Sequence, residues 1–306
     1  MQADLKALDR EAVMAAQAHM GNFAWPTVLL TLGVALGTAG VLAAYMTGLL
    51  PLVPATVLFA VFTYMAYTPL HEAAHNNISA NGRGRWVGEL CGYIAAQLVI
   101  LPHSIHRHEH MAHHRYTNVP GKDPDYLATH MSGGPLALVV GTGRFFVNAL
   151  TWALREECTS TTRGDRIGFA VELLIAYGWR IALMTQMPLL DGVLLFVGGY
   201  VVALFFLVYW FAYRPHHPYE ESARYRNTSS LIAPRWMKPV RWFWLGQDLH
   251  SIHHLFPRVP FYRYRELHNE IEPTLRAQGT PIIGMFDRQP VQPEGESAAS
   301  EQAQAA

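Results

Sequence analysis

Three clusters of histidine are the residues of this sequence whose types and spacing could support chemistry. In the first cluster two histidines are separated by three residues, and in the other two the histidines lie at positions i, i+3 and i+4. Residues at these spacings project from one face of an α-helix. Eight imidazole rings are therefore expected to extend from three helices. They are His71 and His75, then His110, His113 and His114, and finally His250, His253 and His254.

Eight clustered imidazoles indicate a metal centre. Imidazole binds iron, copper, zinc and nickel, and one such ion accepts about six ligands at most, so this number of rings favours two ions. Zinc hydrolases keep about three protein ligands and an open water position. A site this rich in histidine favours a pair of redox irons that activate O2 and remove hydrogen from an unactivated C–H bond. The product would carry a hydroxyl group or a double bond, and the pattern predicts no catalytic residue beyond the metal ligands.

Other residues near the clusters could complete this site. His216 follows the last long apolar segment and is predicted as a ninth metal ligand. His106 lies one helical turn before His110 and could face the same centre. Whether His106 or His217 binds metal stays open. Glu72 lies within the first cluster, where a carboxylate is expected to orient an imidazole ring.

Four long apolar segments are expected to position the clusters. Each approaches the ~20 residues that an α-helix needs to cross the hydrocarbon core of a bilayer. Only 15% of the chain is charged, against about 25% in a typical soluble domain, which agrees with membrane insertion. Very short turns near Pro51 and Pro188 join the segments into two helical hairpins. The predicted spans are Ala24–Leu49, Leu52–Leu70, Ile167–Met187 and Gly192–Tyr213.

The distribution of charge predicts how the spans are oriented. Lys6 and Arg10 precede the first span, nine basic residues lie between the hairpins, and eleven more follow Tyr213. The two short turns carry none. Because cytoplasmic loops of membrane proteins are enriched in Lys and Arg, both termini and the histidine clusters are expected on the cytoplasmic side of a bacterial-type inner membrane. The clusters can then meet without crossing the bilayer.

Two shorter apolar stretches and one pair of charges need a separate interpretation. Trp86–Leu101 and Leu136–Leu154 are too short or too polar for clear spans and are predicted as re-entrant or interfacial helices. Glu172 and Arg180 lie within the third span, where a charge is costly unless it is partnered. We expect them to form a mutual or interhelical ion pair that faces the bundle interior.

These features predict an all-α integral membrane protein with a cytoplasmic helical cap that bears the histidines. Residues 1–23 would form an N-terminal cytoplasmic segment, residues 24–287 a membrane domain, and residues 288–306 a disordered tail of Pro, Gln, Glu, Ser and Ala. Cys91 and Cys158 provide neither a disulfide framework nor a CxxC metal site. Equal numbers of basic and acidic residues, 23 each, give no indication of a nucleic-acid partner.

The histidine clusters and their flanks resemble the three histidine boxes of the membrane fatty acid desaturase superfamily. The resemblance covers roughly residues 65–280, in matching order and spacing. The flanks are most similar to the desaturase-like bacterial β-carotene hydroxylases. Glu72, where many relatives carry aspartate, departs from the pattern. The resembling flanks are Asn118–Asp125, Gly133–Leu136, Tyr213–Pro218 and Gly246–Pro257.

The resemblance implies that the nine histidines hold two non-haem irons, that O2 is a co-substrate, and that the substrate is a fatty acyl chain or a carotenoid in the bilayer. It also implies a separate electron carrier, of the ferredoxin or cytochrome b5 type. Desaturases, hydroxylases and ketolases share the boxes, so a β-carotene ring hydroxylase or ketolase is one alternative. A metal transporter or a haem-binding protein is a more distant one, because either would place its ligands within the spans.

Overall fold

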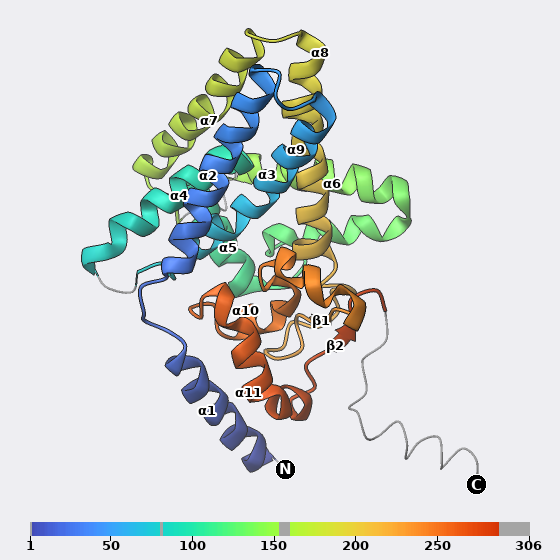
Figure 1. Ribbon diagram of the computed structural model, residues 1–306. Coiled ribbons are helices and arrows are strands. Elements are labelled where there is room, and N and C mark those ends of the chain that lie inside the picture. The colour runs from blue at the N-terminus through green and yellow to red at the C-terminus, as the bar shows by residue number, and fades with distance from the viewer. Residues whose placement is uncertain (1, 80–81, 153–159, 288–306) are drawn as a thin grey trace.

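The computed structural model describes residues 2–79, 82–152 and 160–287, and nearly all regular elements in these ranges are helices (Figure 1). The all-α fold class is therefore confirmed, whereas the predicted tail at 288–306 lies outside the described residues. Four described helices are long and apolar enough to cross a membrane, as predicted. They are α2 (Trp25–Met46), α3 (Leu52–Ala74), α7 (Arg163–Met184) and the continuous helix Leu189–Tyr213.

The four long helices occupy the upper part of the molecule in Figure 1. Pro51 and Pro188 stand directly before the second helix of each hairpin, where a proline suits a helix start. The fourth helix contains α8 (Leu189–Gly192) and α9 (Gly199–Leu207), each followed by a π-helical turn. Helix α3 runs on to Ala74, past the predicted end at Leu70, so the first histidine box belongs to the helix itself.

Two shorter apolar helices accompany the spans. Helix α4 (Arg85–Val99) has 15 residues and α6 (Pro135–Thr151) has 17, so each is shorter than the ~20 residues that a span requires. Helix α4 packs against α2, α3 and α7, and α6 projects to one side of the bundle (Figure 1). Both agree with the interpretation that these stretches do not cross the membrane by themselves.

The predicted ion pair between Glu172 and Arg180 is wrong, although both side chains are buried in the bundle as expected. The Glu172 carboxylate accepts the backbone N–H groups of His103 and Ser104. The Arg180 guanidinium donates to backbone carbonyls at the end of α4. Eight residues along a helix correspond to about 12 Å, which is too far for the two charges to meet.

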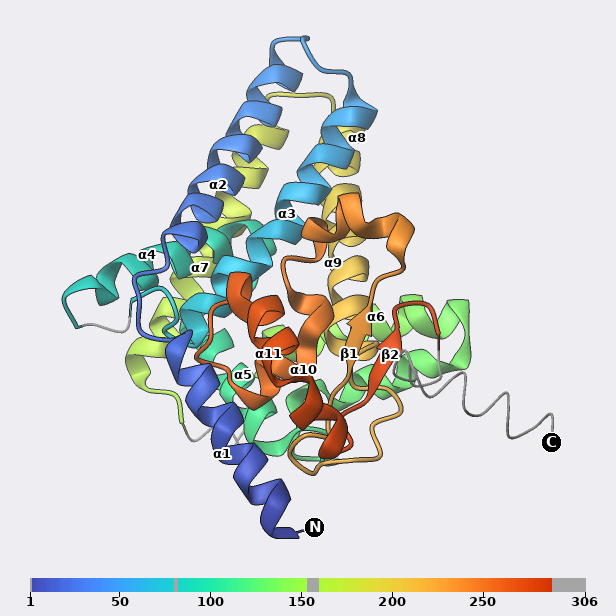
Figure 2. The same cartoon turned by 60° about the horizontal axis from the view of Figure 1, so that its bottom comes forward.

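A helical cap closes one end of the bundle, as Figures 1 and 2 show. Its helix α11 (Tyr264–Ala277) packs against the N-terminal helix α1 (Gln2–Ala18). Two short strands, β1 (Ser230–Ile232) and β2 (Ile282–Gly284), pair in parallel and join two segments of the cap that lie far apart in the sequence. The other described elements are α5 (His103–Tyr116), α10 (His250–Leu255) and the 3-10 segments Gly82–Gly84, Pro124–Gly133, Arg235–Trp244, Gln247–Leu249 and Phe261–Arg263.

One segment of the cap, Arg235–Trp244, lies against the spans themselves. The Tyr64 hydroxyl of α3 donates to the Phe243 carbonyl at 2.6 Å, and the two rings stack with centroids 4.5 Å apart. On the outer side of the same segment, Trp236 and Trp242 are 73% and 63% exposed. The segment therefore packs along the long helices and leaves two large aromatic side chains exposed beside them.

Candidate metal centre

All nine histidines that the sequence suggests as ligands lie together where the cap meets the spans. The last turn of α3 carries His71, and His75 is the C-cap residue that follows it, which puts the first box at the end of a long helix. Helix α5 carries the second box, and the six-residue helix α10 carries the third. His216 joins them from the turn that follows the fourth long helix. Segments far apart in the sequence therefore converge on one buried site.

The rings form two groups of four with one ring between them. Within each group, one ring nitrogen of every member lies within 4.8 Å of those of the others. His114 lies at the same spacing from His253 and His254, which belong to different groups. The first group is His71, His75, His110 and His253, and the second is His113, His216, His250 and His254.

The Nε2 atoms of these rings face one another. Pairs of Nε2 atoms lie between 2.8 Å, for His114 and His253, and 3.3 Å, for His113 and His254. The Nε2 atom of His75 is buried and has no hydrogen-bond partner among the described residues. A neutral imidazole has one donor nitrogen and one acceptor nitrogen, and a cation at such a site would accept the lone pair of each Nε2. The donor set therefore fits two metal ions bound through Nε2.

In three of the rings the other nitrogen, Nδ1, lies within hydrogen-bond distance of a side chain. His113 Nδ1 lies 2.8 Å from a carboxylate oxygen of Asp123, and His253 Nδ1 lies 3.0 Å from the Tyr264 hydroxyl. His216 Nδ1 lies 3.1 Å from the side-chain oxygen of Asn118. Partners of this kind fix the ring orientation and leave the Nε2 lone pair free for a metal.

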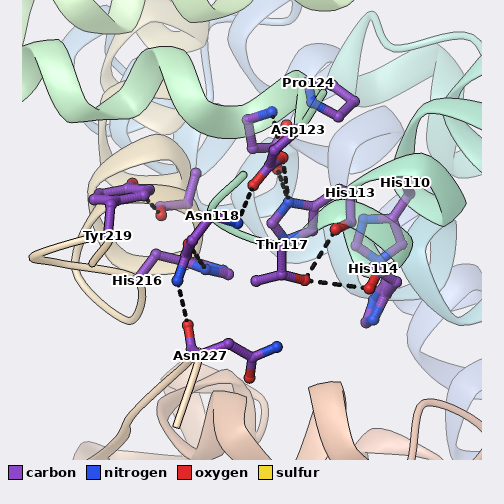
Figure 3. A network of polar contacts seen from close by, with 12 residues as sticks. His110, His113, His114, Thr117, Asn118, Asp123, Pro124, His216, Tyr219 and Asn227 are labelled. Atoms are coloured by element: carbon purple, nitrogen blue, oxygen red, sulfur yellow. Dashed lines mark hydrogen bonds and ion pairs between the residues drawn. The ribbon is translucent and has the colours of Figure 1, made fainter. Parts of the chain in front are cut away.

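Asn118 and Asp123 build this support from a single loop, as Figure 3 shows. The Asp123 carboxylate also accepts the backbone N–H groups of Asn118 and Asp125, at 2.7 and 2.8 Å. The Asn118 amide donates to the carbonyls of Glu221 and Asn227, both at 2.7 Å. Asn118 has a φ of 62°, a left-handed conformation that asparagine tolerates. The sequence offers only one signal for these residues, their place in a flank that resembles the family.

Burial keeps most of the imidazoles in the neutral form that binds metal. It lowers the pKa of His250 to about 3. His113 differs, because burial alone would lower its pKa but the carboxylates of Asp123 and Asp125 outweigh this and raise it to about 9. A cation in the second group would therefore displace a proton from His113. The rings whose pKa burial holds well below its ordinary value are His110, His114, His216, His253 and His254.

His106 and His217 belong to neither group of converging ring nitrogens among the described residues, and whether either binds metal stays a prediction. His106 is buried on α5, and its Nδ1 lies 3.8 Å from the Glu109 carboxylate. His103, at the start of the same helix, has its Nε2 3.2 Å from the Glu89 carboxylate. The His103 contact agrees with a structural role for that ring, whereas both ring nitrogens of His106 lack a hydrogen-bond partner among the described residues.

Glu72 lies beside the first box, where it was expected to orient a ring. Its carboxylate is 3.9 Å from His71 Nδ1, which is longer than a hydrogen bond. It accepts the side-chain amide of Asn77 at 3.4 Å and the backbone N–H of Phe261 at 3.3 Å. Glu72 therefore ties the end of α3 to the cap and makes no hydrogen bond to the His71 ring.

An apolar cavity opens from the histidines into the helical bundle. His110, His113 and His250 line it at the cap end. Along the fourth long helix its lining runs from Ala212 to Tyr200, about 18 Å at 1.5 Å per residue. The second π-helical turn of that helix contributes to the lining, and such turns recur at functional sites. The neighbouring helices add aromatic and aliphatic side chains, which include Tyr67, Val99, Leu101, Phe145, Phe146 and Ala149.

Gly246, just before the third box, is expected to tolerate no side chain. Its φ is +78°, and a Cβ built there would lie 2.6 Å from the Phe261 carbonyl oxygen. Gly246→Ala should therefore destabilise the cap by about 1–3 kcal/mol, measured as a lower thermal midpoint of the purified protein. Gly40→Ala is the matched control, because a Cβ at Gly40 meets nothing within 4 Å. Equal midpoints for the two variants would contradict the strain at Gly246.

Comparison with known proteins agrees with this geometry. The sequence model of the family described as Fatty acid desaturase matches residues 47–285, which confirms the resemblance. The chain is 25% identical over 196 residues to a zeaxanthin 4-ketolase of Chlamydomonas reinhardtii, an alignment that covers 63% of this chain and 38% of the relative. It is 23% identical over 257 residues to a Delta(12) fatty acid desaturase of Calendula officinalis, an alignment that covers 72% of this chain and 66% of the relative. The chain thus spans less than two thirds of either relative. Because the family model matches most of its length, this chain belongs to the fatty acid desaturase family.

Proposed function

We propose that this chain is a membrane-embedded, O2-dependent oxidoreductase that introduces a double bond or an oxygen function into a lipid hydrocarbon. The observation that carries the proposal is the pair of histidine groups at the end of an apolar cavity. Family membership supports it. One relative is a carotenoid ketolase and the other a fatty acid desaturase, so both a carotenoid and a fatty acyl chain remain candidate substrates.

The nine histidines would hold two iron ions, one in each group, with His114 between them. Bound there, the irons would supply the activation of O2 and the removal of hydrogen from an unactivated C–H bond. The chain itself orients the rings through Asn118, Asp123 and Tyr264. The apolar lining of the cavity would hold a hydrocarbon against the histidines and exclude water from the site.

We assign the histidine side of the protein to the cytoplasm. The turns at Thr47–Pro51 and Thr185–Pro188 carry no Lys or Arg, whereas both segments on the histidine side are basic. Electrons would reach the site from a separate carrier, of the ferredoxin or cytochrome b5 type. A cysteine-labelling assay tests the orientation: a cysteine placed at Gly48 should react with a membrane-impermeant reagent added outside intact cells.

A metal transporter fits the arrangement less well. Transport sites place ionisable ligands within the spans near the bilayer midplane. Here His71 and His75 stand at the last turn of α3, and the other seven histidines lie on α5, on α10 and in a turn beyond the fourth span. The cavity that reaches the histidines is apolar, which suits a hydrocarbon rather than a hydrated ion.

The decisive experiment measures metal and products together. The protein would be expressed in a host that makes both fatty acids and β-carotene, then purified and assayed for bound iron while lipids and pigments are profiled by mass spectrometry. About two irons per chain with an oxygenated carotenoid, or with a new double bond or hydroxyl in an acyl chain, would support the proposal and identify the substrate class. Zinc alone under iron-replete conditions would count against it.

Asp123→Asn is expected to lower metal affinity about 10–100-fold, the usual cost of losing a partner that orients a ligand. Asparagine keeps the size of the side chain but loses the charge that holds His113 Nδ1. The measurement is iron retained per chain during titration with a chelator. Glu221→Gln serves as the control, because only the backbone carbonyl of Glu221 contacts Asn118. Wild-type retention in Asp123→Asn would contradict the supporting role.

A further inference from the structure

The third span carries its buried polar side chains on one narrow face. Most of α7 points away from the bundle, yet Glu172, Ala176 and Arg180 are buried, at intervals of four residues. Residues at this interval lie one above the other on a helix. That face meets the junction between α4 and α5, where α4 ends at Val99 and α5 begins at His103. The two buried charges therefore stand opposite two helix ends.

Glu172 caps the start of α5, the helix of the second histidine box. Its Oε2 accepts the His103 backbone N–H at 2.6 Å, and its Oε1 accepts that of Ser104 at 3.1 Å. Pro102 occupies the N-cap position of α5 and has no side-chain group that could accept these hydrogens. A carboxylate at a helix N-terminus also interacts favourably with the helix dipole.

Arg180 binds the carbonyl groups at the end of α4, as Glu172 binds the N–H groups at the start of α5. Its guanidinium donates to the carbonyls of Gln97 at 2.8 Å and Leu98 at 2.9 Å. The Tyr200 hydroxyl, from the fourth span, donates to the next carbonyl, that of Val99, at 2.8 Å. Backbone groups at helix ends that are buried in a bilayer protein must find partners, because no water replaces them. The negative and positive charges of α7 thus match the polarity of the two helix ends.

We propose that Glu172 is a positioning residue that sets where α5, and with it the second histidine box, begins. His110 lies seven residues after His103, about 10 Å along the helix, so a shift at the first turn moves every ring of this box. The role rests on the proposed function, because the rings matter only if they bind metal. Arg180 secures the α4 side of the same junction.

Two further observations describe how closely α7 and α5 are joined around Glu172. Gly168, one turn earlier on α7, lets the helices approach so closely that a Cβ there would lie 3.1 Å from the Ser104 Cβ. Two other polar links between the described residues of these helices meet at Asp165, from Arg107 at 2.9 Å and from His108 Nε2 at 3.4 Å. Both of these links reach α5 through side chains beyond its first turn, whereas Glu172 binds the backbone N–H groups of His103 and Ser104. Losing the Glu172 contacts therefore leaves the first turn of α5 without this partner.

The test combines amide hydrogen exchange with iron analysis on the full chain in lipid nanodiscs. Glu172→Ala should accelerate exchange in peptides that start at His103 by roughly five- to tenfold, the size expected for a lost cap. It should also lower the iron held per folded chain. Glu172→Gln keeps one acceptor oxygen, so both effects should be intermediate. Ile175→Ala, which is 53% exposed on the same helix, is the matched control and should change neither quantity.

Three results would overturn the inference. If Glu172→Ala leaves the exchange rate at the start of α5 unchanged, Glu172 does not cap that helix. If the exchange rate rises uniformly across all four spans, Glu172 contributes to the general stability of the fold and does not position α5. If exchange is faster at the start of α5 but the iron content equals that of the wild type, the cap does not position the metal ligands. Wild-type protein that binds no iron would instead overturn the proposed function and the positioning role with it, whereas the exchange data would still establish the cap.

Discussion

His113→Ala is expected to abolish product formation, by more than about 100-fold, and to lower the iron bound per chain. The reason is that His113 supplies one of four converging nitrogens in its group, and the loss of a ligand should exceed the 10–100-fold cost of losing a partner that merely orients one. Membrane insertion should be unaffected, because His113 lies on α5 and outside the four spans. Products, iron and membrane-fraction yield are measured on the same preparation.

The control for this substitution is His130→Ala, which removes an exposed histidine that belongs to neither group. It should keep wild-type iron and activity. The alanine at position 113 also leaves the buried Asp123 carboxylate without its ring partner, which can cost about 1–3 kcal/mol of stability. Iron and activity are therefore normalised to the folded fraction. A fully active His113→Ala protein would contradict the assignment of His113 as a ligand.

The spans and the histidine boxes were predictable because both are local patterns. A span is read from about 20 consecutive residues, and the i, i+3, i+4 spacing of a box fixes which rings share a face before any tertiary contact forms. The convergence of nine rings follows from the topology, since every box stands on the same side of the predicted spans. His216 was predictable only from its place just after a span.

The sequence could not predict which residues of other segments would be the hydrogen-bond partners of the site residues. Asn118 and Asp123 orient His216 and His113 across separations of 98 and 10 residues, and Tyr264 holds His253 from a different helix. The error at Glu172 and Arg180 has the same origin. Their partners are backbone groups at helix ends, which leave no mark on side-chain identity.

The cavity links this site to the choice of substrate. Its walls come from α3, the end of α4, α6 and the fourth long helix, so its width depends on how α6 packs against the bundle. Ala149 lies on α6 and is buried in the lining, whereas Val147, two residues earlier, is 58% exposed. Position 149 therefore allows the cavity to be narrowed without a change to any histidine or to any partner of one.

Ala149→Trp is expected to lower activity about tenfold or more while iron per chain stays at the wild-type level. The indole would occupy space in the cavity that the histidines line, and a small misplacement of a reacting group can cost about 100-fold. Val147→Trp is the matched control and should retain activity. Because a ring-bearing carotenoid needs more width than a slender acyl chain, the carotenoid product should fall further if both are formed. Wild-type turnover of both substrates by Ala149→Trp would mean that neither reaches the histidines through this cavity.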